Sequence, residues 1–190
     1  MKKKAKINLL AIACILMLLA MFILPQFMGP DHSIIRNTLS DLGAQNSAGA
    51  WIINSILVAL AFSSVISGWG FYKGFVFNRV ILVLFGVSIF LSALFNHAPV
   101  NPEIPYNIIE DGWHKYFACI TWIFFAILAF STALMHKKQT DRSLAFMAGI
   151  SAVSLSLLSS EAAQTAGIWQ RLLFIISFGW LIYTLKTTDY

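Results

Sequence analysis

Long apolar runs alternate with short polar segments along the whole chain. A helix needs about 20 mostly apolar residues to cross a bilayer, and the usual range is about 17–25. Six runs meet or approach this length, at residues 7–28, 51–72, 80–96, 115–135, 143–159 and 168–185. The pattern therefore predicts an all-α fold with one transmembrane domain over residues 1–190, built as a bundle of six membrane-spanning helices.

The run at 143–159 is the weakest of the six because it carries Ser151, Ser154, Ser156 and Ser159. Small residues in a membrane helix commonly mark close packing against neighbouring helices. The same serines are also suited to line a polar pathway. Both interpretations remain open at this point.

The composition supports the membrane interpretation. The chain of 190 residues is 58% hydrophobic and only 11% charged, with a mean hydropathy of +0.76, whereas a soluble domain carries about 25% charged residues. The net charge of +5 is spread over short clusters between apolar runs, so it does not indicate nucleic-acid binding. Cys14 and Cys119 both lie inside apolar runs, which favours small core residues over a disulfide or a zinc knuckle.

The basic residues predict the orientation, because cytoplasmic loops of membrane proteins are rich in Lys and Arg. If the N-terminus is cytoplasmic and six spans alternate, ten of the 13 basic residues fall inside and three outside. Both termini are then cytoplasmic, and Trp51, Trp113 and Trp169 lie near the outer boundary. Such a chain suits a bacterial or archaeal inner membrane. The outer basic residues are Arg36, Lys115 and Arg171, and the inner ones are Lys2, Lys3, Lys4, Lys6, Lys73, Arg79, Lys137, Lys138, Arg142 and Lys186.

This alternation gathers the unusual polar side chains on the extracytoplasmic side. The segment 96–114 holds two of the four histidines, and its three prolines keep most of it out of a regular helix. Arg171 lies about one turn inside the last run, where an ionised side chain is costly. We therefore expect a carboxylate partner for it, with Asp41, Asp111 and Glu161 as the candidates, in either a structural salt bridge or a substrate site. The outer polar residues are Asp31, His32, Arg36, Ser40, Asp41, Asn96, His97, Glu103, Glu110, Asp111, His114, Glu161 and Gln164.

Residues 36–43, with the sequence RNTLSDLG, allow two interpretations. In the first, Ser40 or Asp41 caps a short helix and Gly43 ends a turn. In the second, Asp41 is a ligand or general base, and Ser40 is its hydrogen-bond partner or a nucleophile. The spacing alone does not separate the two.

Asp111 and His114 are three residues apart, so they share a helix face if the fourth helix begins early. Together with His97 they form a donor set suited to zinc or another divalent metal, which would activate a bound water. Two alternatives use no metal: histidines that only form hydrogen bonds at the interface, and an acid/base pair.

Three segments resemble the prokaryotic membrane family known as domain of unknown function 998. They are residues 36–43, the loop after the third run that leads to His114, and residues 167–171 with the sequence GIWQR. The resemblance implies a six- or seven-span membrane protein and supplies no activity. In plan, one Ser, one Asp and several His at one face are also distantly similar to alkaline ceramidases and adiponectin receptors, which use a histidine-bound zinc. The last run of this chain has no histidine, which argues against that mechanism.

Two functions follow from the one-sided cluster. The first is a membrane-embedded hydrolase or transferase acting on a lipid or lipid-linked substrate at the outer leaflet. Its partners are membrane lipids and not nucleic acid. Its catalytic residues are Asp41, Asp111, His114 and Ser40, with substrate held by Arg36, Arg171 and Glu161. The alternative is a non-enzymatic lipid-binding, scaffolding or small-transport protein in which the same residues tie helices together.

Overall fold

The computed structural model describes residues 3–28 and 32–187, so Asp31 and Lys2 lie outside the described residues. The described part is helical and contains no strand. Six of its helices are long and apolar enough to cross a membrane, as predicted. The elements are α1 (Lys3–Ile23), the 3-10 helix η1 (Leu24–Phe27), α2 (Leu39–Leu42), α3 (Ala50–Phe71), α4 (Val76–Leu94), α5 (Ile108–Met135), α6 (Gln139–Glu161) and α7 (Ala166–Thr187).

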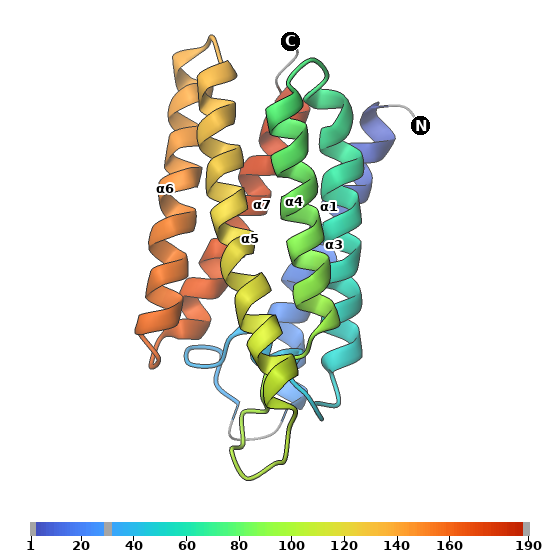
Figure 1. Ribbon diagram of the computed structural model, residues 1–190, viewed down its shortest axis with the longest axis vertical. Helices are drawn as coiled ribbons and strands as arrows, with labels where there is room; N and C mark the ends of the chain where they lie inside the picture. The colour runs from blue at the N-terminus through green and yellow to red at the C-terminus, as the bar shows by residue number, and fades with distance from the viewer. Residues whose placement is uncertain (1–2, 29–31, 188–190) are drawn as a thin grey trace.

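The contacts of the six long helices form a closed ring that follows the order of the chain. Each helix packs mainly against its neighbours in sequence, and α7 returns to pack against α1. Figure 1 shows α1 beginning and α7 ending at the same end of the bundle, as an even number of spans requires. The opposite end carries residues 32–49 and 95–107, and we call it the loop end.

Apolar and aromatic side chains fill the interior of the ring. Phe85 of α4, Phe125 of α5 and Phe178 of α7 are almost fully buried. The ring centroids of Phe85 and Phe125 are 5.5 Å apart, and those of Phe85 and Phe178 are 6.1 Å apart, which are favourable distances for aromatic pairs. This core fixes the middle parts of α4, α5 and α7 relative to one another.

Helix α5 begins at Ile108, earlier than the apolar run at 115–135 indicated. The side chain of Asn107 caps it, because its Oδ1 accepts hydrogen bonds from the N–H groups of Ile109 and Glu110 at 3.0 and 3.3 Å. Glu110 and Asp111 also place negative charge in the first turn, where the helix dipole favours it. Its 28 residues span about 42 Å, so the first turns extend beyond a hydrocarbon core of about 30 Å.

The burial of residues in helix α6 bears on the two interpretations of its serines. The residues that α6 buries against its neighbours are Ala145, Ala148, Gly149 and Ala152. Ser154 is exposed, and Ser156 and Ser159 line a cavity described below. The fully buried positions of this helix are therefore alanine and glycine, and Ser151 is half-buried.

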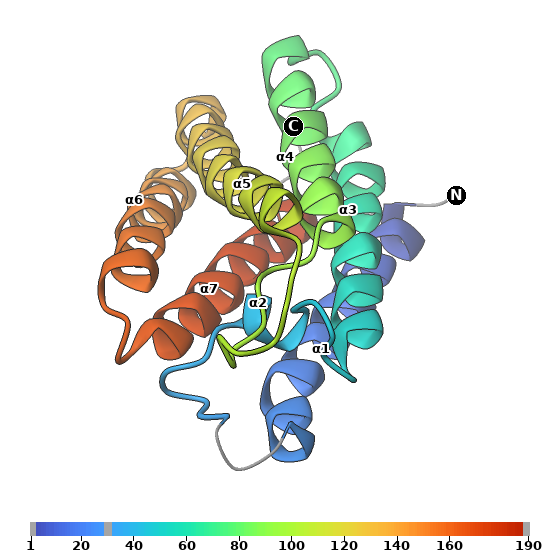
Figure 2. The ribbon, with the colours of Figure 1, turned by 60° about the horizontal axis from the view of Figure 1, so that its bottom comes forward.

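The short helix α2 closes the loop end of the bundle. In Figure 2 it lies inside the ring of long helices, and the loop between α4 and α5 passes close to it. Helix α2 contacts α3 and α7. This position brings residues 38–42 close to the start of α5 and the start of α7.

Candidate functional site

Helix α2 begins with a capping box. Its N-cap residue is neither Ser40 nor Asp41, the two residues expected from the sequence. Thr38 is the N-cap, and its side chain accepts a hydrogen bond from the N–H of Asp41 at 3.2 Å. The Asp41 carboxylate in return accepts from the Thr38 N–H at 2.7 Å. Gly43 ends the helix, as expected. Ser40 therefore takes no part in capping, and its hydroxyl is available for another partner.

The loops before α3 and before α5 are joined by Gln45. Its backbone N–H donates to the carbonyl oxygen of His97 at 2.8 Å, and its Nε2 donates to those of Asn96 and Asn107 at 3.1 and 3.0 Å. Its Oε1 accepts from the Asn107 N–H at 2.8 Å. These bonds hold the ends of α4 and α5 against the segment that carries α2.

The start of α7 is joined to the same segment by Arg171. This side chain is 3% exposed and donates to four backbone carbonyls, those of Met21 at 3.1 Å, Ile34 and Asn37 at 2.8 Å, and Gly167 at 2.9 Å. Among the described residues no carboxylate pairs with it, so the expected salt bridge to Asp41, Asp111 or Glu161 is wrong. Carbonyl oxygens therefore partner Nε and Nη1 of this buried charge, whereas its Nη2 has no hydrogen-bond partner among the described residues.

Gly167 permits this close approach. A Cβ at this position would collide with the carbonyl oxygens of Ile34 and Asn37. The N–H groups of Gly167 and Ile168, in the first turn of α7, donate to the carbonyls of Arg36 and Ile35 at 3.2 Å each, and the Ile168 N–H also donates to the Thr165 carbonyl at 3.0 Å. Residues 34–37 and the start of α7, which are more than 130 positions apart in the sequence, therefore meet at the loop end.

Ser40 and His114 meet in this region. The Ser40 Oγ lies 3.0 Å from Nε2 of His114. The Nδ1 of His114 lies 2.8 Å from the carbonyl oxygens of both Ser92 and Phe95. Carbonyl oxygens only accept, so Nδ1 carries the proton and Nε2 of the neutral ring is an acceptor. The Ser40 hydroxyl therefore donates to His114, which is the arrangement of a nucleophile and its general base.

Asp111 lies one helical turn from His114, as the early start of α5 requires, but it does not orient the His114 ring. Its Oδ1 accepts from the Ala98 N–H at 2.9 Å, and its Oδ2 accepts from Lys115 Nζ at 2.7 Å. His97 Nδ1 is 3.4 Å from the same Oδ1. The position that a triad carboxylate occupies next to Nδ1 of the base is taken here by the two backbone carbonyls.

The residues His97, Asp111 and His114 do not fit the metal site expected from the sequence. Within the described ranges, no three His, Cys, Asp or Glu side chains are arranged to hold a metal ion. The rings of His97 and His114 are near each other, with centroids 5.3 Å apart. However, protein atoms engage both nitrogens of His114 and both oxygens of Asp111.

Two cavities adjoin the Ser40–His114 pair. A cavity of about 460 Å³ lies between α5, α6 and α7, and Ser40 and His114 both line it. A smaller one of about 30 Å³ lies on the inner side and is also lined by both residues. Gln170 borders the two cavities. Its Oε1 accepts the N–H of Leu39, so its amide nitrogen is left to donate to a ligand.

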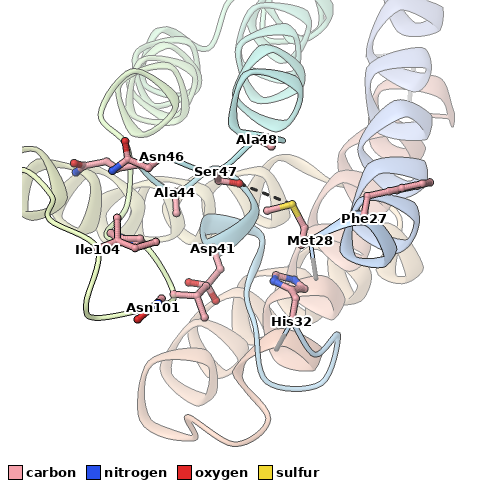
Figure 3. A pocket seen from close by; sticks show the side chains of 13 residues that line it. Phe27, Met28, His32, Asp41, Ala44, Asn46, Ser47, Ala48, Asn101 and Ile104 are labelled. Atoms are coloured by element: carbon pink, nitrogen blue, oxygen red, sulfur yellow. Dashed lines mark hydrogen bonds between the residues drawn. The ribbon is translucent and has the colours of Figure 1, made fainter. Parts of the chain in front are cut away.

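Asp41 belongs to a different part of the loop end. It lines a cavity of about 290 Å³ and a cleft of about 790 Å³, and it lines neither of the two cavities at Ser40. Figure 3 shows Asp41 between Asn101 and His32 at the first of these. The predicted cluster is therefore divided into two neighbouring sites, and His97 lines both the cleft and the 460 Å³ cavity.

The other predicted binding residues occupy separate positions. Arg36 is exposed and lines the cleft beside Asp41. Glu161 is exposed at the end of α6 and makes no hydrogen bond or ion pair within the described part of the chain. Burial lowers the pKa of His32, although the nearby Asp41 carboxylate acts in the opposite direction. Of the three residues expected to hold substrate, only Arg36 lines one of these cavities.

Sequence reasoning missed Gln45 and Gln170. A glutamine has no charge and no metal preference, so neither residue stood out from composition or spacing. Gln170 lies within the GIWQR segment, directly before Arg171, and a polar residue in the first turn of a membrane helix was the available signal. Asn54 was missed in the same way, and its Nδ2 donates to Asn96 Oδ1 at 2.6 Å.

The fold is that of a multi-pass helical membrane protein. Residues 11–185 match the family described as Protein of unknown function (DUF998), and the chain belongs to that family. The resemblance predicted from the sequence is thereby confirmed. No curated protein and no solved structure matches the chain, so the distant likeness to ceramidases and adiponectin receptors has no support from these comparisons.

Proposed function

We propose that this protein is a membrane-embedded serine hydrolase or acyl transferase that acts on a lipid or lipid-linked ester. The observation that carries the proposal is the hydrogen bond from Ser40 Oγ to Nε2 of His114, with Nδ1 held by the carbonyls of Ser92 and Phe95. Nucleophile, base and orienting group are the three parts that activate a serine. The carbonyls keep the imidazole in the tautomer that accepts the serine proton.

The reaction proceeds in two steps. The Ser40 Oγ attacks the ester carbonyl carbon while its proton passes to Nε2 of His114, and the bond to the leaving alcohol breaks as His114 returns that proton to the alcohol oxygen. The acyl group is then bound to Ser40. In hydrolysis a water molecule attacks the acyl carbon and gives its proton to Nε2 of His114. The bond between that carbon and Ser40 Oγ then breaks, the carboxylic acid leaves, and His114 returns the proton to Ser40. In acyl transfer, a second alcohol or amine takes the place of that water.

The surroundings of the pair support both steps. The 30 Å³ cavity beside His114 has room for one or two water molecules, since about 10–15 Å³ of such volume holds one. The Gln170 amide nitrogen is available to donate to the oxygen that gains charge during the attack, a role that side-chain amides fill in other acyl-transfer sites. Asp111, Lys115 and Arg171 then contribute by fixing the loops.

The site is proposed to face the extracytoplasmic side. The basis is the distribution of Lys and Arg, which places Lys73, Arg79, Lys137 and Lys138 at the end of the bundle opposite the loop end. His114 lies near the point where α5 leaves the hydrocarbon core. The substrate ester is therefore expected at the level of the outer leaflet headgroups.

The test compares purified wild-type protein with Ser40→Ala in lipid nanodiscs, using a panel of acyl esters and measuring the released acid or alcohol. We expect wild-type turnover and a loss of more than about 10³-fold in Ser40→Ala. Ser47→Ala is the matched control, since Ser47 also lies at the loop end and its hydroxyl donates to the Leu42 carbonyl. The control should retain full activity.

Two results would contradict the proposal. If Ser40→Ala retains the activity of the wild-type protein, Ser40 is not the nucleophile. If folded wild-type protein turns over no ester in the panel and no serine-directed reagent modifies Ser40, the non-enzymatic alternative holds, and the loop-end network is a structural tie.

A further inference from the structure

The 460 Å³ cavity at Ser40 is open to the side of the bundle. Its walls come from α5, α6 and α7, and the flanking α5 and α6 both have the length and hydropathy of membrane spans. Cys119 of α5 and Leu157 of α6 line the cavity and are themselves exposed. Exposed side chains on membrane-spanning helices face lipid, so this cavity opens toward the acyl region of the bilayer.

The lining suits an amphiphile. Trp122, Leu157 and Leu173 supply apolar surface, whereas Ser156 and Ser159 lie at the last turns of α6 near the loop end. The volume falls within the range of about 300–1,000 Å³ that small-molecule sites occupy. The inner cavity of about 30 Å³ is too small for an acyl chain. An acyl chain whose ester group lies at Ser40 therefore has to occupy the cavity of about 460 Å³, which forms a groove between α5 and α6.

The polar part of the same molecule has a separate place. The cleft of about 790 Å³ at the loop end is lined by Arg36, Asp41, His97 and Glu103, among others. His97 also lines the cavity of about 460 Å³, so the cleft and this cavity adjoin at His97. Side chains of both signs border the cleft, which favours a neutral or zwitterionic head group over a strongly anionic one.

We infer that the substrate is a long-chain acyl ester of a membrane lipid. Its acyl chain enters sideways through the groove between α5 and α6, and its head group lies in the cleft beside Arg36 and Asp41. This inference rests on the proposed function, because it assumes that Ser40 is the reacting group. It adds the direction of access, the separation of chain and head, and the preference for a long acyl chain.

The test uses alkyl fluorophosphonates with a short or a long alkyl chain on protein in nanodiscs. Such a reagent is attacked at phosphorus by Ser40 Oγ, the P–F bond breaks, fluoride leaves and the serine proton passes to His114. Peptide mass spectrometry then measures the rate of modification at Ser40. We expect the long-chain reagent to react about tenfold faster or more, because its methylene groups are buried in the groove.

Cys119 offers a way to block the groove after the protein has folded. In a Cys14→Ala background Cys119 is the remaining thiol. Its alkylation with a maleimide adds bulk inside the cavity of about 460 Å³. We expect this treatment to slow the long-chain reagent by about tenfold or more and the short-chain reagent by less than about twofold. A Cys14→Ala, Cys119→Ala variant treated in the same way is the control and should not change.

The outcomes separate the two proposals. If the short-chain reagent modifies Ser40 but chain length and Cys119 alkylation have no effect, the groove inference is overturned and the serine chemistry stands. If neither reagent modifies Ser40 in folded protein, both are overturned. Long-chain preference together with sensitivity to Cys119 alkylation supports the lateral route.

Discussion

Two of the buried polar regions in the protein differ in what surrounds them. Near the end opposite the loops, the hydroxyl oxygens of Tyr72 and Thr132 are 2.9 Å apart, and Asn78 Nδ2 donates to Ser131 Oγ at 2.9 Å. Tyr72 and Thr132 are both 0% exposed. At the loop end, His114 is also buried, at 6% exposed, but it and Ser40 line two cavities.

The comparison shows that a buried hydrogen bond alone does not indicate a site. The Tyr72–Thr132 pair consists of groups that stay neutral, satisfies its own donors and joins α3 to α5. The Ser40–His114 pair combines a hydroxyl with a base held in one tautomer and adjoins space for a ligand. The loop end also depends on contacts between segments far apart in the sequence, so it is the less local of the two regions.

The largest expected effect is on catalysis at the loop end. Replacing His114 by Gln removes the base, and we expect turnover of the ester substrate to fall by about 10²–10⁴-fold. The measurement is steady-state hydrolysis in nanodiscs, with size-exclusion profiles as the check on folding. Unchanged turnover in a folded His114→Gln protein would exclude the proposed base.

The next largest effect concerns the arginine that joins three segments. Arg171→Met leaves four carbonyl groups without their charged donor, and each bond of this kind contributes about 1.5–3 kcal/mol. We expect a loss of about 3 kcal/mol or more in unfolding free energy, measured by denaturation in detergent micelles. Arg171→Lys keeps the charge but not the guanidinium geometry. Its unfolding free energy should therefore lie between those of Arg171→Met and the wild type. Wild-type stability of Arg171→Met would show that these bonds are not needed.

A methyl group at Gly167 tests how closely α7 approaches the α2 segment. A Cβ there would strike the carbonyls of Ile34 and Asn37, and such overpacking costs about 1–3 kcal/mol. Gly167→Ala should therefore lower the melting temperature and increase proteolysis of the segment before α3. Gly179→Ala in the same helix is the control, because a Cβ at Gly179 meets nothing within 4 Å. Equal behaviour of the two variants would contradict the close approach.

The polar pair opposite the loop end should respond in stability alone. Tyr72→Phe removes one hydrogen bond to Thr132, for which we expect about 1 kcal/mol of destabilisation. Its rate of ester turnover should remain that of the wild type at temperatures where both are folded. A loss of turnover comparable to that of His114→Gln would remove the distinction between the two regions.

The smallest effect is a pH dependence at His32. Burial lowers the pKa of His32 in the folded protein, so below about pH 6.5 the unfolded state binds the proton more readily. Stability should therefore fall slightly as the pH drops through this range, until the folded state also protonates. His32→Asn should flatten this dependence in melting curves between pH 7.5 and about pH 5. A slope that is identical in both proteins would show that His32 does not cause it.

The sequence predicted the six spans because length and hydropathy act locally, but it did not predict the closed ring in which they pack. It also indicated that Asp111 and His114 share a helix face. It could not predict that Asp41 and Ser40 line different cavities. The two are neighbours in a short helix, where neighbouring side chains point to different sides. The sequence also could not predict the carbonyl partners of Arg171, because the pattern of side chains does not indicate which backbone carbonyls act as acceptors.

The pairing of Ser40 with His114 depended on long-range geometry. The two residues are 74 positions apart, and their meeting requires the Thr38–Asp41 capping box, the early start of α5 at its Asn107 cap and the contacts of Gln45. The first two features follow from local chemistry, whereas the contacts of Gln45 join residues 51 and 62 positions apart. Their combined effect depends on tertiary packing, which a single sequence does not supply.

The most direct test of the Ser40–His114 pair is nitrogen NMR of histidine-labelled protein at about pH 8, with His114→Gln used to assign the His114 signals. We predict the tautomer with the proton on Nδ1, and an Nε2 chemical shift that moves when Ser40 is replaced by Ala, because Nε2 accepts the serine hydroxyl. A proton on Nε2, or an Nε2 signal that does not change in Ser40→Ala, would contradict the arrangement on which the proposed chemistry depends.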